Sequence, residues 1–408
     1  MPKNHLRSAS IINRRIPFDK HCLIAYNVEN ATHLVGADAL IGPHATSESK
    51  GEDFIMTLSP AFLPPLLGWY EQNKRDLPWR HDREPYHIWL SEIMLQQTRV
   101  EAVKGYYARF LTELPDIPAL AACDPDRLHK LWEGLGYYSR VRNLQKAAQQ
   151  IVSDCGGTFP TEYDKIRALP GIGDYTAGAI CSICFGRPTP AVDGNVLRVV
   201  SRLTADERPV AQPAVKKDYT AALAEIYPAG QCAEMTQALM ELGATVCAPN
   251  GAPHCDLCPV AAFCRSREAE LWRTIPVKEA KKPRRTEQKT LFFLTCGDRT
   301  AVRKRPAKGL LAGLWELPNV DGFLEPQAAL ELLETWGLRP TELKKQLEKQ
   351  HIFTHITWYM RCYYIECAAP GGGFTWVDAA RFARDISLPT AFRQFWEEAQ
   401  EPPQGRNL

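Results

Sequence analysis

The spacing of hydrophobic residues changes from a helical to a strand-like pattern at about residue 288. Before that point, apolar residues recur every three or four positions in segments that end at glycine or proline. Helices are expected at about 86–103, 104–113, 118–122, 125–133, 137–154 and 161–168. Ser59-Pro60 predicts an earlier helix start. Two further apolar helices are expected, one within 169–185 and one after Asp193.

Beyond residue 288, short runs rich in β-branched and aromatic residues replace the helical pattern. These runs are Thr290–Thr295, Thr300–Arg303, Ile356–Ile365 and Phe374–Val377, and a helix is expected at about 326–337. The sequence therefore predicts a mainly α N-terminal domain followed by an α+β C-terminal domain.

The distribution of charge along the chain also changes near this boundary. The 408 residues carry 49 Lys+Arg against 47 Asp+Glu, a net charge of +2 that gives no overall reason to expect nucleic acid. Residues 278–308 alone carry +8, so the rest carries −6. The basic run is either a solvated tether or a contact for DNA or a partner protein. The predicted domains are a flexible N-terminal extension (1–56), a helical domain (57–275), a basic linker (276–288), an α+β domain (289–398) and a tail (399–408).

Two compartments are disfavoured by the sequence. The longest nearly apolar run, Ala177–Phe185, is about half the length of a membrane span, so no membrane contact is expected. The predicted extension contains several acids, which a transit peptide lacks. Thirteen cysteines cannot all pair, which favours free thiols, a metal site or both.

Four of the cysteines lie close together in the sequence. Cys247, Cys255, Cys258 and Cys264 are spaced C-x7-C-x2-C-x5-C. Four thiolates so close in sequence suit one [4Fe–4S] cluster or one zinc ion. The single C-x2-C with longer arms favours the cluster. A second C-x2-C, Cys181 and Cys184, lies in an apolar helix and is interpreted as core.

A glycine-rich hairpin, Leu169-Pro170-Gly171-Ile172-Gly173, precedes one of the apolar helices. Gly171 and Gly173 allow a sharp turn and a close approach of the backbone to a ligand. The free N–H groups at the start of the next helix make a phosphate-binding corner that needs no lysine. An ordinary helix–turn–helix corner is the alternative.

Two carboxylates stand in contrasting settings. Glu92 shares a helix face with large apolar residues, which raises a carboxyl pKa and keeps a proton available at neutral pH. Asp193, in Val192-Asp193-Gly194-Asn195, precedes a helix, where it is either an N-cap or a catalytic group. Two such carboxylates suit cleavage of a glycosidic bond.

The hairpin, the Val-Asp-Gly-Asn motif and the four-cysteine loop, in this order, resemble the helix–hairpin–helix DNA glycosylases of the endonuclease III/MutY superfamily over about 58–275. Over 58–398 the chain resembles the MutY-type adenine DNA glycosylases. Tyr175 stands where bifunctional enzymes have a nucleophilic lysine, so hydrolysis without strand cleavage is implied. Residues 309–316 and 351–355 resemble the MutT/Nudix-like domain that recognises 8-oxoguanine.

The resemblance implies roles for residues of this chain. Glu92 would protonate adenine N7, Asp193 would stabilise the sugar cation, and Tyr175 would lie beside both. The residues implied to contact DNA are Arg80 and Gln237 at the extruded adenine, Gln97 and Tyr137 in the vacated space, Gly171 and Gly173 at the backbone, and Phe353, Thr354 and His355 at 8-oxoguanine. The implied cofactor is one [4Fe–4S] cluster held by the four cysteines.

The implied substrate is double-stranded DNA with A:8-oxoguanine or A:G mispairs, and the protein is expected to be a monomer in a reducing cytoplasm, associated with the nucleoid. This chain departs from the family at several positions. It has seven residues between the first two cysteines instead of six, Thr354 where serine is common, and Asp174 where proline or a basic residue is common. The acid at Asp174 is expected to weaken DNA binding somewhat.

Three other functions remain as alternatives. A Nudix hydrolase would need acids that this sequence replaces, for example Gly322 and Thr335, so the C-terminal domain is interpreted as a binding module. An endonuclease III-like glycosylase/lyase acting on oxidised pyrimidines is the nearest enzyme alternative. A DNA-binding iron–sulfur protein without activity would require Glu92 and Asp193 to be purely structural.

Overall fold

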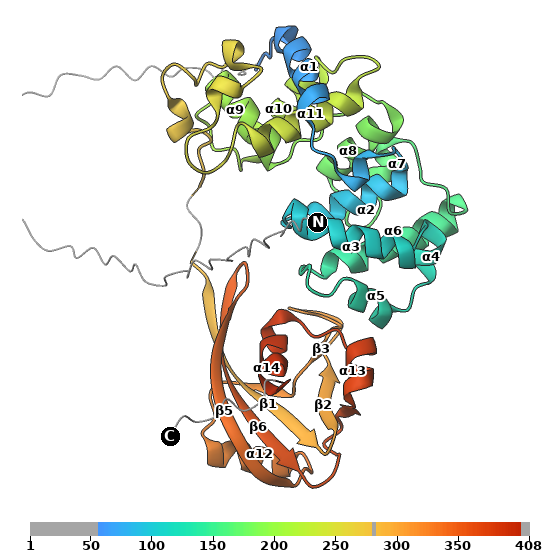
Figure 1. The fold of residues 1–408 in the computed structure, drawn as a ribbon, viewed down its shortest axis with the longest axis vertical. Coiled ribbons are helices and arrows are strands. Elements are labelled where there is room, and N and C mark those ends of the chain that lie inside the picture. Colours follow the sequence, from blue (N-terminus) through green and yellow to red (C-terminus); the bar gives the residue numbers. More distant parts are fainter. Residues whose placement is uncertain (1–55, 280–282, 401–408) are drawn as a thin grey trace, which may run out of the picture. The chain divides into compact units, whose positions relative to one another are not determined.

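The computed structural model describes residues 56–279 and 283–400, here called the helical lobe and the sheet lobe (Figure 1). The predicted extension, apart from Met56, lies outside the described residues, and so do Lys281 and Lys282 of the basic linker. Met56 itself is buried and packs into the helical lobe. The folded part therefore includes the last residue of the range predicted as an extension.

The helical lobe consists of helices and short 3-10 turns, as predicted. Its α-helices are α1 (Leu63–Asn73), α2 (Pro85–Leu95), α3 (Val100–Glu113), α4 (Ile117–Ala122), α5 (Pro125–Leu131), α6 (Ser139–Cys155), α7 (Tyr163–Arg167), α8 (Asp174–Phe185), α9 (Gly194–Thr204), α10 (Pro213–Ala224) and α11 (Cys232–Thr245). Its 3-10 turns are η1 (Pro60–Phe62), η2 (Pro78–Arg80), η3 (Cys255–Leu257), η4 (Ala261–Phe263) and η5 (Leu271–Arg273). The Ser59 side chain accepts a hydrogen bond from the Ala61 N–H at the first turn, which confirms the predicted start.

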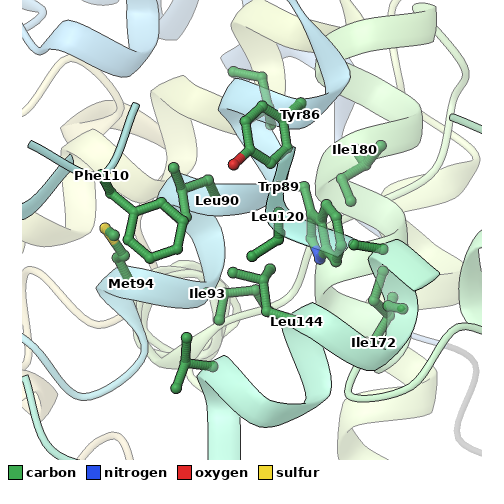
Figure 2. Close-up of a cluster of buried hydrophobic side chains, with 14 of the residues drawn as sticks. Tyr86, Trp89, Leu90, Ile93, Met94, Phe110, Leu120, Leu144, Ile172 and Ile180 are labelled. Atoms are coloured by element: carbon green, nitrogen blue, oxygen red, sulfur yellow. The ribbon is translucent and has the colours of Figure 1, made fainter. Parts of the chain in front are cut away.

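Two hydrophobic clusters hold the helical lobe together. The larger cluster surrounds α2, whose Trp89, Leu90 and Ile93 are buried against α3, α6 and α8 (Figure 2). The second cluster joins α1 to α9, α10 and α11. Cys181 is buried in the first cluster and Cys184 packs against it, which confirms their interpretation as core.

The predicted helix 86–103 is wrong in one respect. In the structure, α2 ends at Leu95 and α3 begins at Val100. Gln97, between the two helices, has a positive φ of 56°. A left-handed residue cannot continue a right-handed helix. The buried Arg140 side chain donates to the carbonyl oxygens that the ending helix leaves free. Periodicity could not show this break, because apolar residues lie on both sides of it.

The sheet lobe is a mixed sheet with helices on both faces. Its elements are β1 (Arg285–Cys296), β2 (Arg299–Lys304), β3 (Trp315–Glu316), β4 (Asn319–Asp321), α12 (Pro326–Thr335), β5 (Pro340–Ile352), β6 (Ile356–Cys367), β7 (Thr375–Val377), α13 (Ala379–Asp385) and α14 (Thr390–Gln400). The main strand order is β3-β2-β1-β6-β5, and the central β1 and β6 are parallel. One face packs against α13 and α14 and the other against α12.

Two predictions about this lobe need correction. Strand β1 begins at Arg285, inside the range 276–288 predicted as a linker, because Arg285 to Gln288 pair with Ile356 to Tyr359 of β6. The sequence analysis also missed β5, an edge strand of 13 residues whose side chains are mostly exposed. An exposed edge strand carries no alternation of buried and exposed residues strong enough to read.

Among the described residues, no helix is both long and apolar enough to span a membrane.

Candidate active site

A cavity of about 590 Å³ opens in the helical lobe where its two hydrophobic clusters meet. It brings together six residues singled out from the sequence, although they are widely separated along the chain. They are Arg80, Glu92, Gln97, Tyr175, Asp193 and Gln237. Each comes from a different helix, turn or loop, so the fold alone assembles them. This space is called the catalytic cavity below.

Glu92 lies on the last full turn of α2, at the edge of the larger hydrophobic cluster. Only 6% of the residue is exposed, because Ile88, Trp89 and Ile93 of the same helix anchor α2 in the core. Burial raises the pKa of Glu92 to about 7, the Tyr175 hydrogen bond opposes this rise, and the charge of Asp193 adds to it. The sequence prediction of a carboxyl group that keeps its proton near neutral pH is consistent with this setting.

Tyr175 follows the glycine hairpin as the second residue of α8. Its hydroxyl donates a short hydrogen bond to Glu92 Oε2. Burial raises the pKa of Tyr175 well above its usual value, and the charges of Glu92 and Asp193 add to the rise. The phenol therefore stays protonated and acts only as a donor toward Glu92.

Asp193 is both an N-cap and a wall of the catalytic cavity. Its Oδ1 accepts the backbone N–H groups of Asn195 and Val196 at 2.9 and 2.8 Å, and its Oδ2 accepts the Asn195 side-chain amide at 2.7 Å. Burial raises the pKa of Asp193, and these hydrogen bonds oppose the rise. The capping and catalytic interpretations, posed as alternatives from the sequence, are compatible, since capping holds the carboxylate at the cavity wall.

A chain of hydrogen bonds leads from Asp193 toward the cysteine loop. Arg198 donates to Asn195 Oδ1 at 2.9 Å and to the Gly243 carbonyl oxygen at 2.8 Å. The same guanidinium donates from Nε to the Cys247 carbonyl oxygen at 2.8 Å. One arginine thus connects the cap of α9 to the first residue of the four-cysteine loop.

The far side of the catalytic cavity is held by a buried acid that sequence reasoning missed. Glu241 of α11 has no exposed surface and receives hydrogen bonds from Arg75 at 2.6 Å and from Arg80 at 2.7 Å. Burial alone would raise its pKa, but these two bonds lower it below the usual value. Arg80 is therefore held by Glu241. No motif marks this acid; its only sequence signal is a position four residues after Gln237 on the same helix face.

Gln237 is oriented by a partner that is distant in sequence. The Tyr70 hydroxyl donates to Gln237 Oε1 at 2.6 Å. With one lone pair of its oxygen occupied, Gln237 keeps its amide N–H₂ group for a ligand in the cavity. Tyr70 was not predicted as a site residue either.

Of the two hairpin glycines, only Gly171 has the turn geometry that the sequence predicts. Gly171 has a φ of 78°, and a Cβ built on it would lie 2.7 Å from Asn143 Cβ, so this position requires glycine. Gly173 is the exposed N-cap of α8 and no side chain caps it. The unexpected acid Asp174 forms an ion pair with Arg167 at 2.5 Å, which offsets the negative charge at this corner. The two glycines do not line the catalytic cavity.

A second cavity of about 580 Å³ gathers the remaining predicted contacts. It is lined by Gln97, Tyr137, Phe353, Thr354 and His355, among others. The Tyr137 hydroxyl and Thr354 Oγ1 share a hydrogen bond of 2.9 Å. Phe353 is partly buried against Trp358, whereas Thr354 and His355 are exposed at the tip of the β5–β6 hairpin. Gln97 borders both cavities.

The four cysteines of the loop line one small space of about 30 Å³ beside Arg202. No group of three or more His, Cys, Asp or Glu in the described part of the chain is arranged as a ready site for one metal ion. Burial raises the pKa of the Cys258 thiol to about 12 and also raises those of Cys255 and Cys264, so these thiols need a cationic centre to ionise. Four thiols around a common space match the donor set of an iron–sulfur cluster, whose four irons each take one cysteine.

Comparison with known proteins adds two family matches. The model of the HhH-GPD superfamily of base excision DNA repair proteins matches residues 90–224, and that of the NUDIX domain matches residues 290–398. These ranges fall within the helical lobe and the sheet lobe, respectively.

Curated relatives cover more of the chain. An adenine DNA glycosylase of Homo sapiens is 36% identical over 356 residues, which is 72% of this chain and 65% of that protein. The adenine DNA glycosylase of Mus musculus is 34% identical over 417 residues, covering 85% of this chain and 80% of that protein. That of Buchnera aphidicola subsp. Schizaphis graminum is 30% identical and covers 72% of this chain and 84% of its own length.

Proposed function

Because this chain belongs to the adenine DNA glycosylases, a family of helix–hairpin–helix base excision repair proteins, we propose that it hydrolyses the N-glycosyl bond of adenine mispaired with 8-oxoguanine or guanine in duplex DNA. Removal of that adenine would prevent G:C to T:A transversions. One observation carries the proposal: Glu92, Tyr175 and Asp193 line one cavity, and Tyr175 donates to Glu92.

The first step is protonation of the base. Burial raises the pKa of Glu92 to about 7, which keeps a proton available near neutral pH, and Glu92 delivers this proton to N7 of the extruded adenine. Protonation turns adenine into a neutral leaving group. Tyr175 occupies Glu92 Oε2, so Oε1 is the oxygen available to face the base.

The second step is stabilisation of the sugar. As the bond to adenine lengthens, positive charge develops at C1′, and the Asp193 carboxylate faces it. The three hydrogen bonds to Asp193 are already formed, so the carboxylate needs no reorientation during the reaction. Water then adds to C1′, and the Glu92 carboxylate, which has given its proton to adenine, accepts the proton that the water loses. No lysine takes the place of Tyr175, so no Schiff base forms and the strand stays intact.

The choice of mispair is assigned to the second cavity. Thr354 and His355 offer hydrogen-bonding groups at its rim, and Tyr137 and Gln97 present exposed side chains toward the same space. Thr354 and His355 would contact the base opposite adenine, and Gln97 and Tyr137 would fill the space that the adenine leaves when it enters the catalytic cavity. Arg80 and Gln237 would hold the adenine itself, with Glu241 and Tyr70 fixing their orientation.

The four cysteines are proposed to hold one [4Fe–4S] cluster. The bound cluster would fix the shape of the loop 247–264 and ionise its thiols. Arg202, which donates to Cys247 Sγ at 3.3 Å, and Arg198 connect this loop to α9. Iron analysis and the visible absorption of the purified protein test this assignment independently of activity.

The decisive experiment measures adenine release from a duplex with A opposite 8-oxoguanine, beside A opposite G and C opposite 8-oxoguanine. We expect fast release from the first, slower release from the second and none from the third. Glu92→Gln should abolish release from the first two duplexes. Borohydride trapping tests the lyase alternative: an adduct formed as efficiently as by a bifunctional enzyme would refute the role of Tyr175.

A further inference from the structure

Arg140, in the first turn of α6, is a buried cation without an acidic partner. Only 9% of it is exposed, and none of the described residues offers it a carboxylate within ion-pairing distance. Its Nε has no hydrogen-bond partner. Burial lowers its pKa to about 10, so it remains charged at neutral pH. Buried arginines usually pair with an acid, and another kind of partner must therefore hold this one.

Backbone carbonyl oxygens of one loop provide the first set of partners. Nη1 donates to the carbonyl oxygens of Ile93, Met94 and Gln96 at 2.8, 2.9 and 2.7 Å. Ile93 and Met94 belong to the last turn of α2, and Gln96 is its C-cap, so no further turn of helix satisfies these groups. A cation here also faces the negative end of the α2 dipole.

A second loop provides the other set. Nη2 donates to the carbonyl oxygens of Leu135 and Gly136, both at 3.1 Å. It also reaches Thr98 Oγ1 at 3.3 Å, on the first loop. The guanidinium carbon lies 5.7 Å from the centroid of the Tyr137 ring. One planar side chain thus ties together two loops that are distant from each other in sequence.

Each of these loops carries one strained and exposed residue directly after an anchored carbonyl. Gln97 follows Gln96 and has a φ of 56°; Tyr137 follows Gly136 and has a φ of 47°. A left-handed conformation costs a residue other than glycine about 1–2 kcal/mol. Tyr137 is also 47% exposed, although tyrosine is a large and partly apolar residue. The two strained residues border the same second cavity.

We propose that Arg140 is a positioning residue for base extrusion: its guanidinium locks the two loops into one wedge and sets the spacing at which Gln97 and Tyr137 enter the duplex. This rests on the proposed function, in which both side chains fill the space that the adenine leaves. The hydrogen bonds of Arg140 would lower the entropy cost of ordering the loops on DNA binding, because the loops already hold their strained shape before DNA arrives. A lysine cannot replace Arg140, since one ammonium lacks the planar fork that reaches both loops.

The test compares two substrates under single-turnover conditions. One is the duplex with A opposite 8-oxoguanine; in the other, an abasic-site analogue replaces 8-oxoguanine, so extrusion breaks no base pair. Arg140→Lys should slow release from the first duplex by about 10–100-fold and from the second only slightly. The control is Arg109→Lys, an exposed arginine of α3 that stacks on Tyr106 and should change neither rate.

A double-variant experiment tests whether Arg140 acts through the two wedge residues. In a Gln97→Ala/Tyr137→Ala background, Arg140→Lys should have little further effect on the first duplex. Full additivity of the losses would overturn the proposal. So would an equal loss on both substrates, which is the result expected of a residue needed only for folding.

Hydrogen exchange measures the coupling of the two loops without an activity assay. In Arg140→Lys, the amides of residues 93–99 and 135–139 should lose protection together while the rest of the helical lobe is unchanged. Loss in one segment alone would refute the coupling. If the wild-type protein released no adenine, the proposed function would fail. Hydrogen exchange would still show whether Arg140 connects the two loops. If Arg140→Lys did not fold, Thr98→Val, which removes one acceptor at a half-buried position, should give the same pattern at smaller size.

Discussion

The two cavities are nearly equal in volume but are built in opposite ways. The catalytic cavity depends on buried groups that satisfy one another: Glu92 with Tyr175, and Glu241 with Arg80. The second cavity presents exposed side chains on loops, such as Tyr137 and Thr354, whose hydroxyl groups share a hydrogen bond. Size therefore does not distinguish the two cavities, whereas the degree to which their polar groups satisfy one another does.

This difference suggests a division of labour. Groups that stabilise charge must be fixed before the substrate arrives, because reorganisation during the reaction costs rate. Groups that test a base pair must leave hydrogen-bonding capacity free for DNA. Changes in the catalytic cavity should therefore alter rate or stability, and changes in the second cavity should alter the choice of substrate.

Among the changes that test this comparison, Asp193→Asn is expected to have the largest effect. The amide retains a helix cap but loses the negative charge that faces C1′, so single-turnover release should fall by about 10²–10³-fold. Asp116→Asn is the matched control, since Asp116 caps α4 in the same way, accepting from the Ala119 N–H at 2.8 Å, and is not part of the catalytic cavity. It should keep the wild-type rate. Wild-type release by Asp193→Asn would refute the mechanism.

Glu241→Gln tests how much the buried ion pairs of the catalytic cavity contribute to the free energy of unfolding. It removes the charge that Arg75 and Arg80 share, and breaking a buried pair costs about 3 kcal/mol. Urea denaturation measures the loss. The control is Glu234→Gln on the same helix, where the more exposed ion pair with Arg83 should contribute less than about 1 kcal/mol. Equal losses would contradict the distinction between the two sites.

Thr354→Val tests the recognition side. Removing one hydroxyl should reduce the preference for A opposite 8-oxoguanine over A opposite G by up to about tenfold, the value of one hydrogen bond. The rate on A:G serves as the internal control and should stay the same. If both rates fell together, Thr354 would belong to the catalytic machinery and the division between the cavities would not hold.

Tyr175→Phe should shift a pH profile rather than abolish activity. In the wild-type protein, release should fall as pH rises through about 7, because Glu92 then loses its proton. The Tyr175 hydrogen bond lowers the pKa of Glu92, so its removal should move the inflection to higher pH. The profile of single-turnover rates measures this. A shift to lower pH would mean that Tyr175 stabilises the protonated form of Glu92 instead.

The smallest effect is expected at the hairpin. Asp174→Asn frees Arg167 from an exposed ion pair, so affinity for undamaged duplex should rise slightly. The salt dependence of binding should become steeper, since one more cation can meet a phosphate. Glu162→Gln, which breaks the exposed pair with Lys165 on α7, is the control and should change neither quantity.

The sequence was most informative where a residue type is demanded by local chemistry. Gly171 needs a positive φ, Asp193 caps a helix, and Glu92 lies on an apolar helix face. In each case the neighbouring sequence indicates the role of the residue. Glu241 and Tyr70 belong to no motif, because their partners lie at the opposite end of the helical lobe's sequence and only the fold reveals them. The break at Gln97 escaped for the same reason, since the Arg140 side chain that holds it comes from α6, several helices further along the chain.

The contacts between α1 and α11 have a consequence for how the protein is made. Arg75, just after the end of α1, must wait for Glu241 of α11, which lies 166 residues later, before their ion pair can form. At about 5–20 residues per second, the ribosome needs roughly 8–33 s to synthesise that interval. During this time the side of α1 that packs against α11 has no partner. A nascent chain that stops before α11 lacks Gln237 and Glu241 and cannot complete the catalytic cavity.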